Sequence, residues 1–289
     1  MIKTILVPTS GSRSDDSVFA TALAVARSLG AHLDFYHVRL TVGEAALRAP
    51  HMEYCLRPAL PAALERLHQR ERQFAASAAG HFAEFCAANQ IVVRDMPSAA
   101  EEVSAGLLQE TDHAEARLTF HVRHSDLVVL GRPKHVDLMP AGLIETLLVN
   151  SGRPIIIAPD SPPASVTGTV VVGWKETAQA ARSLGAAMPL LKRAQRVVLV
   201  GAVEEADGVL EGLDHLASQL AWHGIAARTH LIVDKSKPAP AQLQRAALDL
   251  GADLLVVGGF SHRPLHELVF GGVTRALIEH AEVPVFMMH

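Results

Sequence analysis

The stretch "DLLVVGGFSHRPLHELVFGGVTRALIEHAEVPVFMM" spans Asp253 to Met288, and its order of features decides the fold. An aspartate and four apolar residues lead to a glycine, an irregular loop, an amphipathic segment, and a proline before a second apolar run. Short apolar runs bounded by glycine and proline are typical of buried strands, and the segment between them predicts a helix. The stretch "DLVVLGRPKHVDLMPAGLIETLLVNSGRPIIIA", from Asp126 to Ala158, has the same order of features.

The beginnings of the two units also match. "TILVPTSGS" (Thr4–Ser12) and "TVVVGWKET" (Thr169–Thr177) are β-branched runs that end in a polar turn, and an Ala-rich helical pattern follows each of them. Gly30 is expected to end the first of these helices, because glycine adopts the left-handed conformation of a helix C-terminus. The spacing between matching positions falls from 165 at the start to 130 at the end, so the first copy carries about 35 extra residues.

This internal repeat predicts two α/β domains in tandem, at residues 1–160 and 166–289, joined by a segment rich in proline and serine. In each domain five near-continuous Val/Ile/Leu strands alternate with helices, which indicates a parallel sheet between two helical layers. The extra residues of the first copy are assigned to about 42–72 and extend a long helix over Leu60–Gln90. We expect the two domains to pair through their last strands, Pro154–Ala158 and Pro284–Met288.

Composition narrows the function. A net charge of −4 and an aromatic content of 4% do not indicate a nucleic-acid partner. Two distant cysteines favour a reducing cytoplasm. No apolar run approaches the roughly 20 residues of a membrane span, and the N-terminus lacks the apolar core of a signal peptide. His262 and His266 have a metal-ligand spacing, but no third ligand is placed nearby, so no metal site is predicted.

Three segments carry a resemblance to a known family. "ILVPTSGS" (Ile5–Ser12), "GWKETAQAARS" (Gly173–Ser183) and the closing stretch from Asp253 resemble the universal stress protein family in its tandem, two-domain form. The resemblance implies flavodoxin-like (adenine nucleotide α-hydrolase-like) domains and a non-catalytic, cytoplasmic protein of the stress response. It also implies that a homodimer is a further way to assemble. Some members bind ATP through a G-x-x-G motif that is followed, after nine residues, by G-S or G-T, and others bind no nucleotide.

The second domain keeps part of that motif. Gly258 and Gly271 fit, whereas Ser261 stands where a glycine is expected and Gly272 stands where a hydroxyl is expected. Backbone amides at the predicted helix start can still face an anion, and Thr274 offers a hydroxyl two residues later. The candidate nucleotide-binding residues are Gly173, Trp174, Lys175, Gly258, Ser261, His262, Gly271, Gly272, Val273 and Thr274.

Several of these residues have a purely structural alternative. The glycines before the helix equally suit close packing of a strand on a helix, and Trp174 either lines an adenine slot or fills it. Lys175 stands where family binders have an aspartate, and it either meets a phosphate or pairs with a carboxylate such as Glu176.

In the first domain only Gly142 aligns with the motif, at the position of Gly272, and two prolines constrain the loop. Arg132 and Lys134 there are expected to bind a different anion or to be solvated. We therefore expect at most one ATP, or other adenine nucleotide, per chain, in the second domain.

Two other functions stay open. One is a ligand-free interaction module of the same fold. The other is a weak ATPase or adenylating enzyme, suggested by a faint likeness of "SGSRSDDS" (Ser10–Ser17) to a pyrophosphate loop. Hydrolysis of ATP needs a carboxylate to hold the metal, and Ser10 and Lys175 occupy the positions where it is expected. No nucleophile–base constellation can be assembled from the sequence, so no catalytic residue is predicted.

Overall fold

The computed structural model describes residues 1–40, 60–97, 102–112, 114–132, 142–202, 206–232, 238–259 and 272–289. The first half contains, in chain order, β1 (Thr4–Pro8), a 3-10 turn (Arg13–Asp15), α1 (Asp16–Leu29), β2 (His32–Leu40), α3 (Leu60–Asn89), β3 (Val92–Val93), β4 (Ser104–Asp112), α4 (Ala114–His124), β5 (Leu127–Leu130), α5 (Leu143–Asn150) and β6 (Ile155–Ile157). The second half contains β7 (Thr169–Gly173), α6 (Ala178–Leu191), β8 (Arg196–Ala202), α7 (Ala206–Ala221), β9 (Ala227–Ile232), α8 (Ala239–Asp249), β10 (Leu254–Gly258), α9 (Gly272–His280) and β11 (Val285–Met288).

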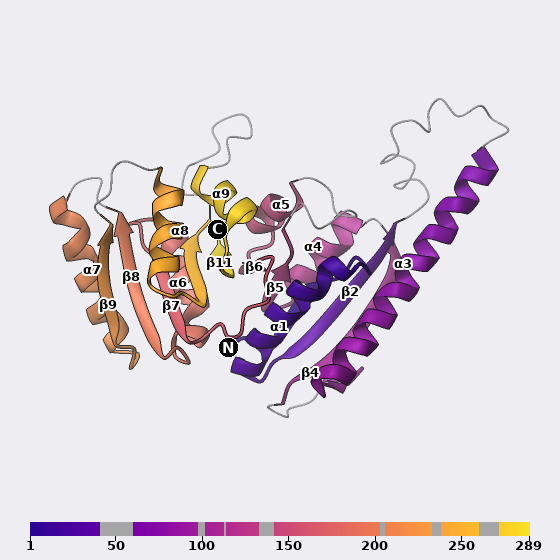
Figure 1. Ribbon diagram of the computed structural model, residues 1–289, viewed down its shortest axis with the longest axis horizontal. Helices are drawn as coiled ribbons and strands as arrows, with labels where there is room; N and C mark the ends of the chain where they lie inside the picture. Colours follow the sequence, from indigo (N-terminus) through magenta and orange to yellow (C-terminus); the bar gives the residue numbers. More distant parts are fainter. Residues whose placement is uncertain are drawn as a thin grey trace.

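All of these strands belong to one sheet. Its order is β3-β4-β2-β1-β5-β6-β11-β10-β7-β8-β9, and Figure 1 shows it running through the whole molecule with helices on both sides. Neighbouring strands within each half are parallel, as the repeat predicts. The two halves meet at β6 and β11, which pair antiparallel with Ile156 opposite Phe286. Unlike the second half, the first half carries an additional two-residue strand, β3, at its outer edge.

The aspartate that opens both repeated stretches has a structural role. The Oδ2 atom of Asp126 accepts the backbone N–H of Thr4 at 3.1 Å, and the Oδ2 atom of Asp253 accepts that of Thr169 at 2.6 Å. In each half the carboxylate thus satisfies the amide at the start of the first strand. A buried or edge amide without an acceptor costs free energy, which explains why both copies carry aspartate at this position.

Side chains that alternate along the strands form two apolar cores, one on each face of the sheet. One core packs under α1, α3, α6 and α7, and the other packs under α4, α5, α8 and α9. At the junction, Phe286 is fully buried in the first core, while its neighbours Val285 and Met287 are buried in the second. Because successive side chains of a strand point to opposite faces, β11 packs into the core on each face of the sheet.

The long helix expected over Leu60–Gln90 is α3, and it ends where Gln90 takes a positive φ of 56°. The remainder of the extra segment, residues 41–59, lies outside the described residues. Ala75, Ala78, Phe82 and Cys86 form the buried side of α3, and the ring of Phe82 lies edge-on to Phe35 of β2 at 5.2 Å. The helix therefore covers the sheet of the first half, and Figure 1 shows it lying across β2 and β4. Among the described helices, none is long and apolar enough to cross a membrane.

A cluster of polar side chains around Glu110 holds α4 against the sheet. Arg117 of α4 donates from Nη2 to Oε1 of Glu110 at 2.7 Å and from Nε to Oε2 at 3.0 Å. His121 and the hydroxyl of Tyr36 each lie 3.2 Å from the same Oε2. The hydrogen bonds from Arg117 are the main reason that the pKa of Glu110 falls to about 2.

Removal of the aromatic ring at the junction should destabilise the whole chain. We expect Phe286→Ala to lower the free energy of unfolding by about 3–5 kcal/mol, because it leaves a cavity in a fully packed core. Urea unfolding followed by circular dichroism measures this loss. Leu248→Ala, at a side chain 40% exposed on α8, is the control and should change stability by no more than about 0.5 kcal/mol. Equal effects of the two variants would contradict the packing described for β11.

The Glu110 cluster predicts a specific dependence of stability on pH. The pKa of Glu110 is lower in the folded chain than its ordinary value of 4.5, so the ionised form favours folding. Its stabilisation should be complete above pH 4.5 and should disappear as the pH falls toward 2. Urea unfolding at several pH values should show a smaller loss over this range in Glu110→Gln than in the unmodified chain. Glu211→Gln, at an exposed position of α7, should behave like the unmodified chain, and an unchanged slope in Glu110→Gln would argue against the cluster.

Candidate functional site

Topology marks one place in each half where a ligand is expected. If the strands of the second half are numbered along the chain, their spatial order is 3-2-1-4-5, and the order reverses between β7 and β10. In open α/β sheets, ligands bind in the crevice outside the carboxyl ends of the two strands at such a reversal. The equivalent place in the first half lies between β1 and β5. Gly173 and Gly258, two of the predicted site residues, end β7 and β10.

Close packing surrounds both glycines and leaves no room for a side chain at Gly258. A Cβ atom on Gly258 would lie 2.6 Å from the backbone nitrogen of Ala180, in the first turn of α6. On Gly173 it would meet the methyl groups of Leu243 and Val257 at 3.0–3.1 Å. Contacts shorter than about 3 Å displace the neighbour, so Gly258 lets α6 approach the end of β10. Of the two roles open from the sequence, the contacts therefore support strand–helix packing for Gly258.

Trp174 packs rather than lining an open slot. Its backbone N–H donates to the carbonyl of Val200 at 2.8 Å, and its partly buried ring lies against the first core. The indole N–H donates to Oε1 of Glu176 at 2.7 Å. Lys175 is exposed and forms no ion pair with Glu176 within the described residues. The positive charge of Lys175 is therefore displayed at the carboxyl end of β7.

The start of α9 is the open part of the predicted site. Gly272 and Val273 are exposed, and a Cβ atom on Gly272 would meet no heavy atom within 4 Å. The first amides of a helix have no partner inside the helix, so those of Gly272 and Val273 are suited to face an anion. Thr274, by contrast, is only 4% exposed, so it does not lie on the open surface. Ser261, His262 and Gly271 lie outside the described residues.

The corresponding strand end in the first half is occupied by a side chain of the protein itself. Oδ2 of Asp15 accepts the backbone N–H groups of Ser10 and Gly11 at 2.8 and 3.1 Å and the hydroxyl of Thr9 at 2.7 Å. Successive amides of this kind form an anion-binding nest. Burial raises the pKa of Asp15, and these hydrogen bonds oppose the rise. The carboxyl group thus sits where an anionic ligand would otherwise bind.

The long helix also closes this end of the first half. Gly11 has a φ of +79°, and a Cβ atom on it would lie 2.5 Å from the carbonyl oxygen of Phe74 and 3.0 Å from the nitrogen of Ala78. Both residues belong to α3, so the turn after β1 packs directly against this helix. The corresponding helix of the second half, α7, is shorter, with 16 residues against 30.

Arg132, expected to bind an anion or to be solvated, is buried and paired with a carboxylate of the protein. It is 5% exposed and donates from Nη1 to Oδ2 of Asp160 at 3.0 Å, beside a cavity of about 200 Å³ near the start of α1. The ion pair offsets its charge. Lys134 lies outside the described residues, while Gly142 precedes α5 with a φ of 80° and open space around it.

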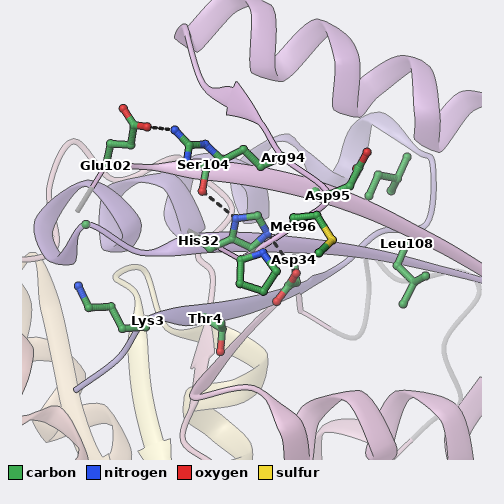
Figure 2. Close-up of a pocket in the computed structure, with 14 residues that line it drawn as sticks. Lys3, Thr4, His32, Asp34, Arg94, Asp95, Met96, Glu102, Ser104 and Leu108 are labelled. Carbon is green, nitrogen blue, oxygen red and sulfur yellow. Dashed lines mark hydrogen bonds and ion pairs between the residues drawn. The ribbon is translucent and has the colours of Figure 1, made fainter. Parts of the chain in front are cut away.

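A second group of residues was not anticipated from the sequence. Ser104, His32 and Asp34 line a cavity of about 690 Å³ at the amino ends of β1, β2 and β4 (Figure 2). Nδ1 of His32 lies 2.8 Å from Oγ of Ser104, and its Nε2 lies 3.2 Å from Oδ1 of Asp34. The fold thus brings together a hydroxyl, an imidazole and a carboxylate that the sequence alone did not.

A signal for two of these three residues was present. Residues two apart on a strand share a face, so a strand from His32 places Asp34 beside it. Ser104 joins them through the pairing of β2 with β4, in which it is opposite His32, and that register depends on how the long insertion returns to the sheet. Elsewhere in the described residues, no three His, Cys, Asp or Glu side chains come together to hold a metal ion.

Comparison with known proteins identifies the second half by sequence. The universal stress protein family model matches residues 168–289. No curated protein matches the chain.

Among solved structures, a universal stress protein from Archaeoglobus fulgidus DSM 4304 aligns with 99% of this chain and 97% of its own, at a TM-score of 0.70 and 16% identity. A protein of unknown function from Pseudomonas aeruginosa PAO1 aligns with 99% of this chain and 92% of its own, at a TM-score of 0.56 and 14% identity. These likenesses extend the shared fold over both halves. The second half of the chain therefore resembles the universal stress protein family in sequence, and the two halves together share the fold of these two-domain structures.

Proposed function

We propose that the protein is a cytoplasmic stress-response protein that binds one ATP, or another adenine nucleotide, in its second half and does not hydrolyse it. The observation that carries this proposal is the difference between the two strand ends. In the first half, Asp15 fills the amide nest and α3 packs on Gly11. In the second half, the start of α9 is exposed at Gly272 and Val273, and the ammonium group of Lys175 is displayed at the end of β7.

The charges at the second site favour an anion. A helix N-terminus carries a partial positive charge and free amides, which suit phosphate, and Lys175 adds a full positive charge at the same edge of the sheet. The same lysine argues against turnover. Phosphoryl transfer from ATP depends on metal ions held by carboxylate or amide side chains, and the position at the end of β7 expected for a carboxylate is lysine. Binding without hydrolysis is the function that this arrangement supports.

A ligand-free interaction module is the second candidate, and specific contacts favour it. Gly258 is used for the packing of α6, and the ring of Trp174 lies against the core rather than beside an open slot. In that case the feature that matters for function is the junction, where β6 and β11 pair within one chain and hold the two halves together. A homodimer of the whole chain would then use surfaces other than these two strands.

Titration calorimetry of ATP into the full chain tests the proposal. We expect one nucleotide per chain, and we expect Gly272→Asp to weaken binding at least about tenfold, because it places a like charge beside the phosphates. The open space at this position accepts the new side chain, and aspartate is favourable at a helix start, so the fold should be retained.

Gly142→Asp is the matched control, because Gly142 aligns with Gly272 but precedes α5 in the first half. It should leave the affinity unchanged. Absence of heat, together with no nucleotide released from the denatured protein, would favour the ligand-free module. Release of ADP at a rate that Gly272→Asp abolishes would overturn the assignment of a non-hydrolysing protein.

A further inference from the structure

The cavity at the amino ends of β1, β2 and β4 lies in the first half, whereas the proposed nucleotide site lies at the carboxyl ends of β7 and β10 in the second half. It has a volume of about 690 Å³, and Ser104, His32 and Asp34 lie on one of its walls (Figure 2). This part of the sheet face is open, because Leu108, further along β4 on the same face as Ser104, is 43% exposed. Ser104 itself is 7% exposed, so a small molecule would reach its hydroxyl through this cavity.

Strand geometry fixes the relation of the three groups. His32 and Asp34 are two residues apart on β2, so they share a face. Ser104 of β4 is the register partner of His32. Gly106, two residues after Ser104, leaves room for the imidazole, because a Cβ atom there would lie 3.4 Å from Nε2 of His32 and 3.0 Å from the carbonyl oxygen of Arg94. The imidazole is therefore held between the serine hydroxyl and the carboxylate.

Hydrogen bonding determines which ring nitrogen carries the proton. Nε2 of His32 lies 3.2 Å from Oδ1 of Asp34, which is the distance of an ion pair when the ring is protonated, and the negative charge of the carboxylate favours a proton on Nε2 over one on Nδ1. In the neutral ring Nδ1 is then unprotonated and accepts the hydroxyl hydrogen of Ser104 across 2.8 Å. A base aimed at a hydroxyl, and oriented in turn by a carboxylate, is the arrangement that activates a serine nucleophile. The two ring nitrogens here have the opposite roles from those in the catalytic triad of serine proteases, where Nε2 faces the serine.

We propose that Ser104 is a nucleophile that accepts an acyl group from small activated esters. Its Oγ attacks the carbonyl carbon and forms a new C–O bond, while its proton passes to Nδ1 of His32. The bond between the carbonyl carbon and the leaving oxygen breaks, and the leaving group departs with the electron pair. The proton on His32 goes to the leaving group or to solvent. No oxidant, metal or nucleotide takes part, so this activity is separate from the function proposed for the second half.

The surroundings predict acylation without rapid turnover. Ser104 and Ala105 have strand partners on both sides, in β2 and β3, so their amides lie in the plane of the sheet and not above it. Without these amides, an oxyanion would depend on Lys3 and Arg94, which line the cavity. The loss of one donor from an oxyanion hole lowers the rate of acyl transfer on the order of 10²–10³-fold. An aryl ester has a good leaving group, which compensates for the weak stabilisation of the oxyanion. The serine ester that forms has a poor leaving group, so its hydrolysis is slow. The acyl group should therefore accumulate on Ser104.

Incubation of the full chain with p-nitrophenyl acetate, followed by mass spectrometry, tests this proposal. We expect a mass gain of one acetyl group, located on Ser104 by peptide mapping. Ser104→Ala should abolish that modification, and His32→Gln should slow it on the order of 100-fold, which is within the usual contribution of a general base. Ser125→Ala is the control, because Ser125 is another buried serine of the first half, and its labelling should equal that of the unmodified chain.

Thermal unfolding of each variant separates chemistry from folding. His32→Gln keeps Ser104 in place, so slow labelling in a variant with unchanged melting supports the role of the imidazole. If Ser104→Ala does not fold, the peptide map of the unmodified chain decides the question by itself. The proposal is overturned if the acetyl group is found elsewhere, if no labelling occurs, or if His32→Gln labels at the rate of the unmodified chain.

Discussion

The structure depends on the antiparallel pairing of β6 with β11. Ile155–Ile157 and Val285–Met287 occupy this junction, and none of these residues is more than 2% exposed. Two parallel half-sheets would otherwise each end in an apolar edge, which invites pairing with other chains. Pairing within the chain covers both edges and fixes how the halves face each other. It also brings the end of β10 close to α5, where a Cβ atom on Gly259 would lie 2.7 Å from Leu148.

The joined halves share a plan but differ at the strand ends where the fold places ligands. In the first half α3 packs on the turn after β1, and the shape of that turn lets Asp15 reach the amides of Ser10 and Gly11. In the second half the same place carries Lys175 and the open start of α9. The strand end of the first half is thus occupied by the protein's own carboxylate, while that of the second half keeps features that favour an anion.

Much of this fold could be predicted because its signals are local. The apolar runs and the helix end at Gly30, whose φ is 61°, depend on residues that are close in sequence. The repeated aspartates bind a strand that the repeat already defines. The roles of Gly258 and Trp174 stayed open because they depend on how closely α6 and the core approach, which no local pattern encodes. The grouping of Ser104 with His32 was missed for a related reason, since strand register across a long insertion is a property of the folded sheet.

The proposed function requires that the two joined halves of the sheet differ in their ability to bind a nucleotide. Hydrogen–deuterium exchange of the full chain, with and without ATP, tests it in a single measurement. The amides of residues 272–280 and 173–177 should exchange more slowly when ATP is present, while those of residues 4–17 should be unaffected. Equal protection of both regions, or protection confined to residues 4–17, would contradict the account.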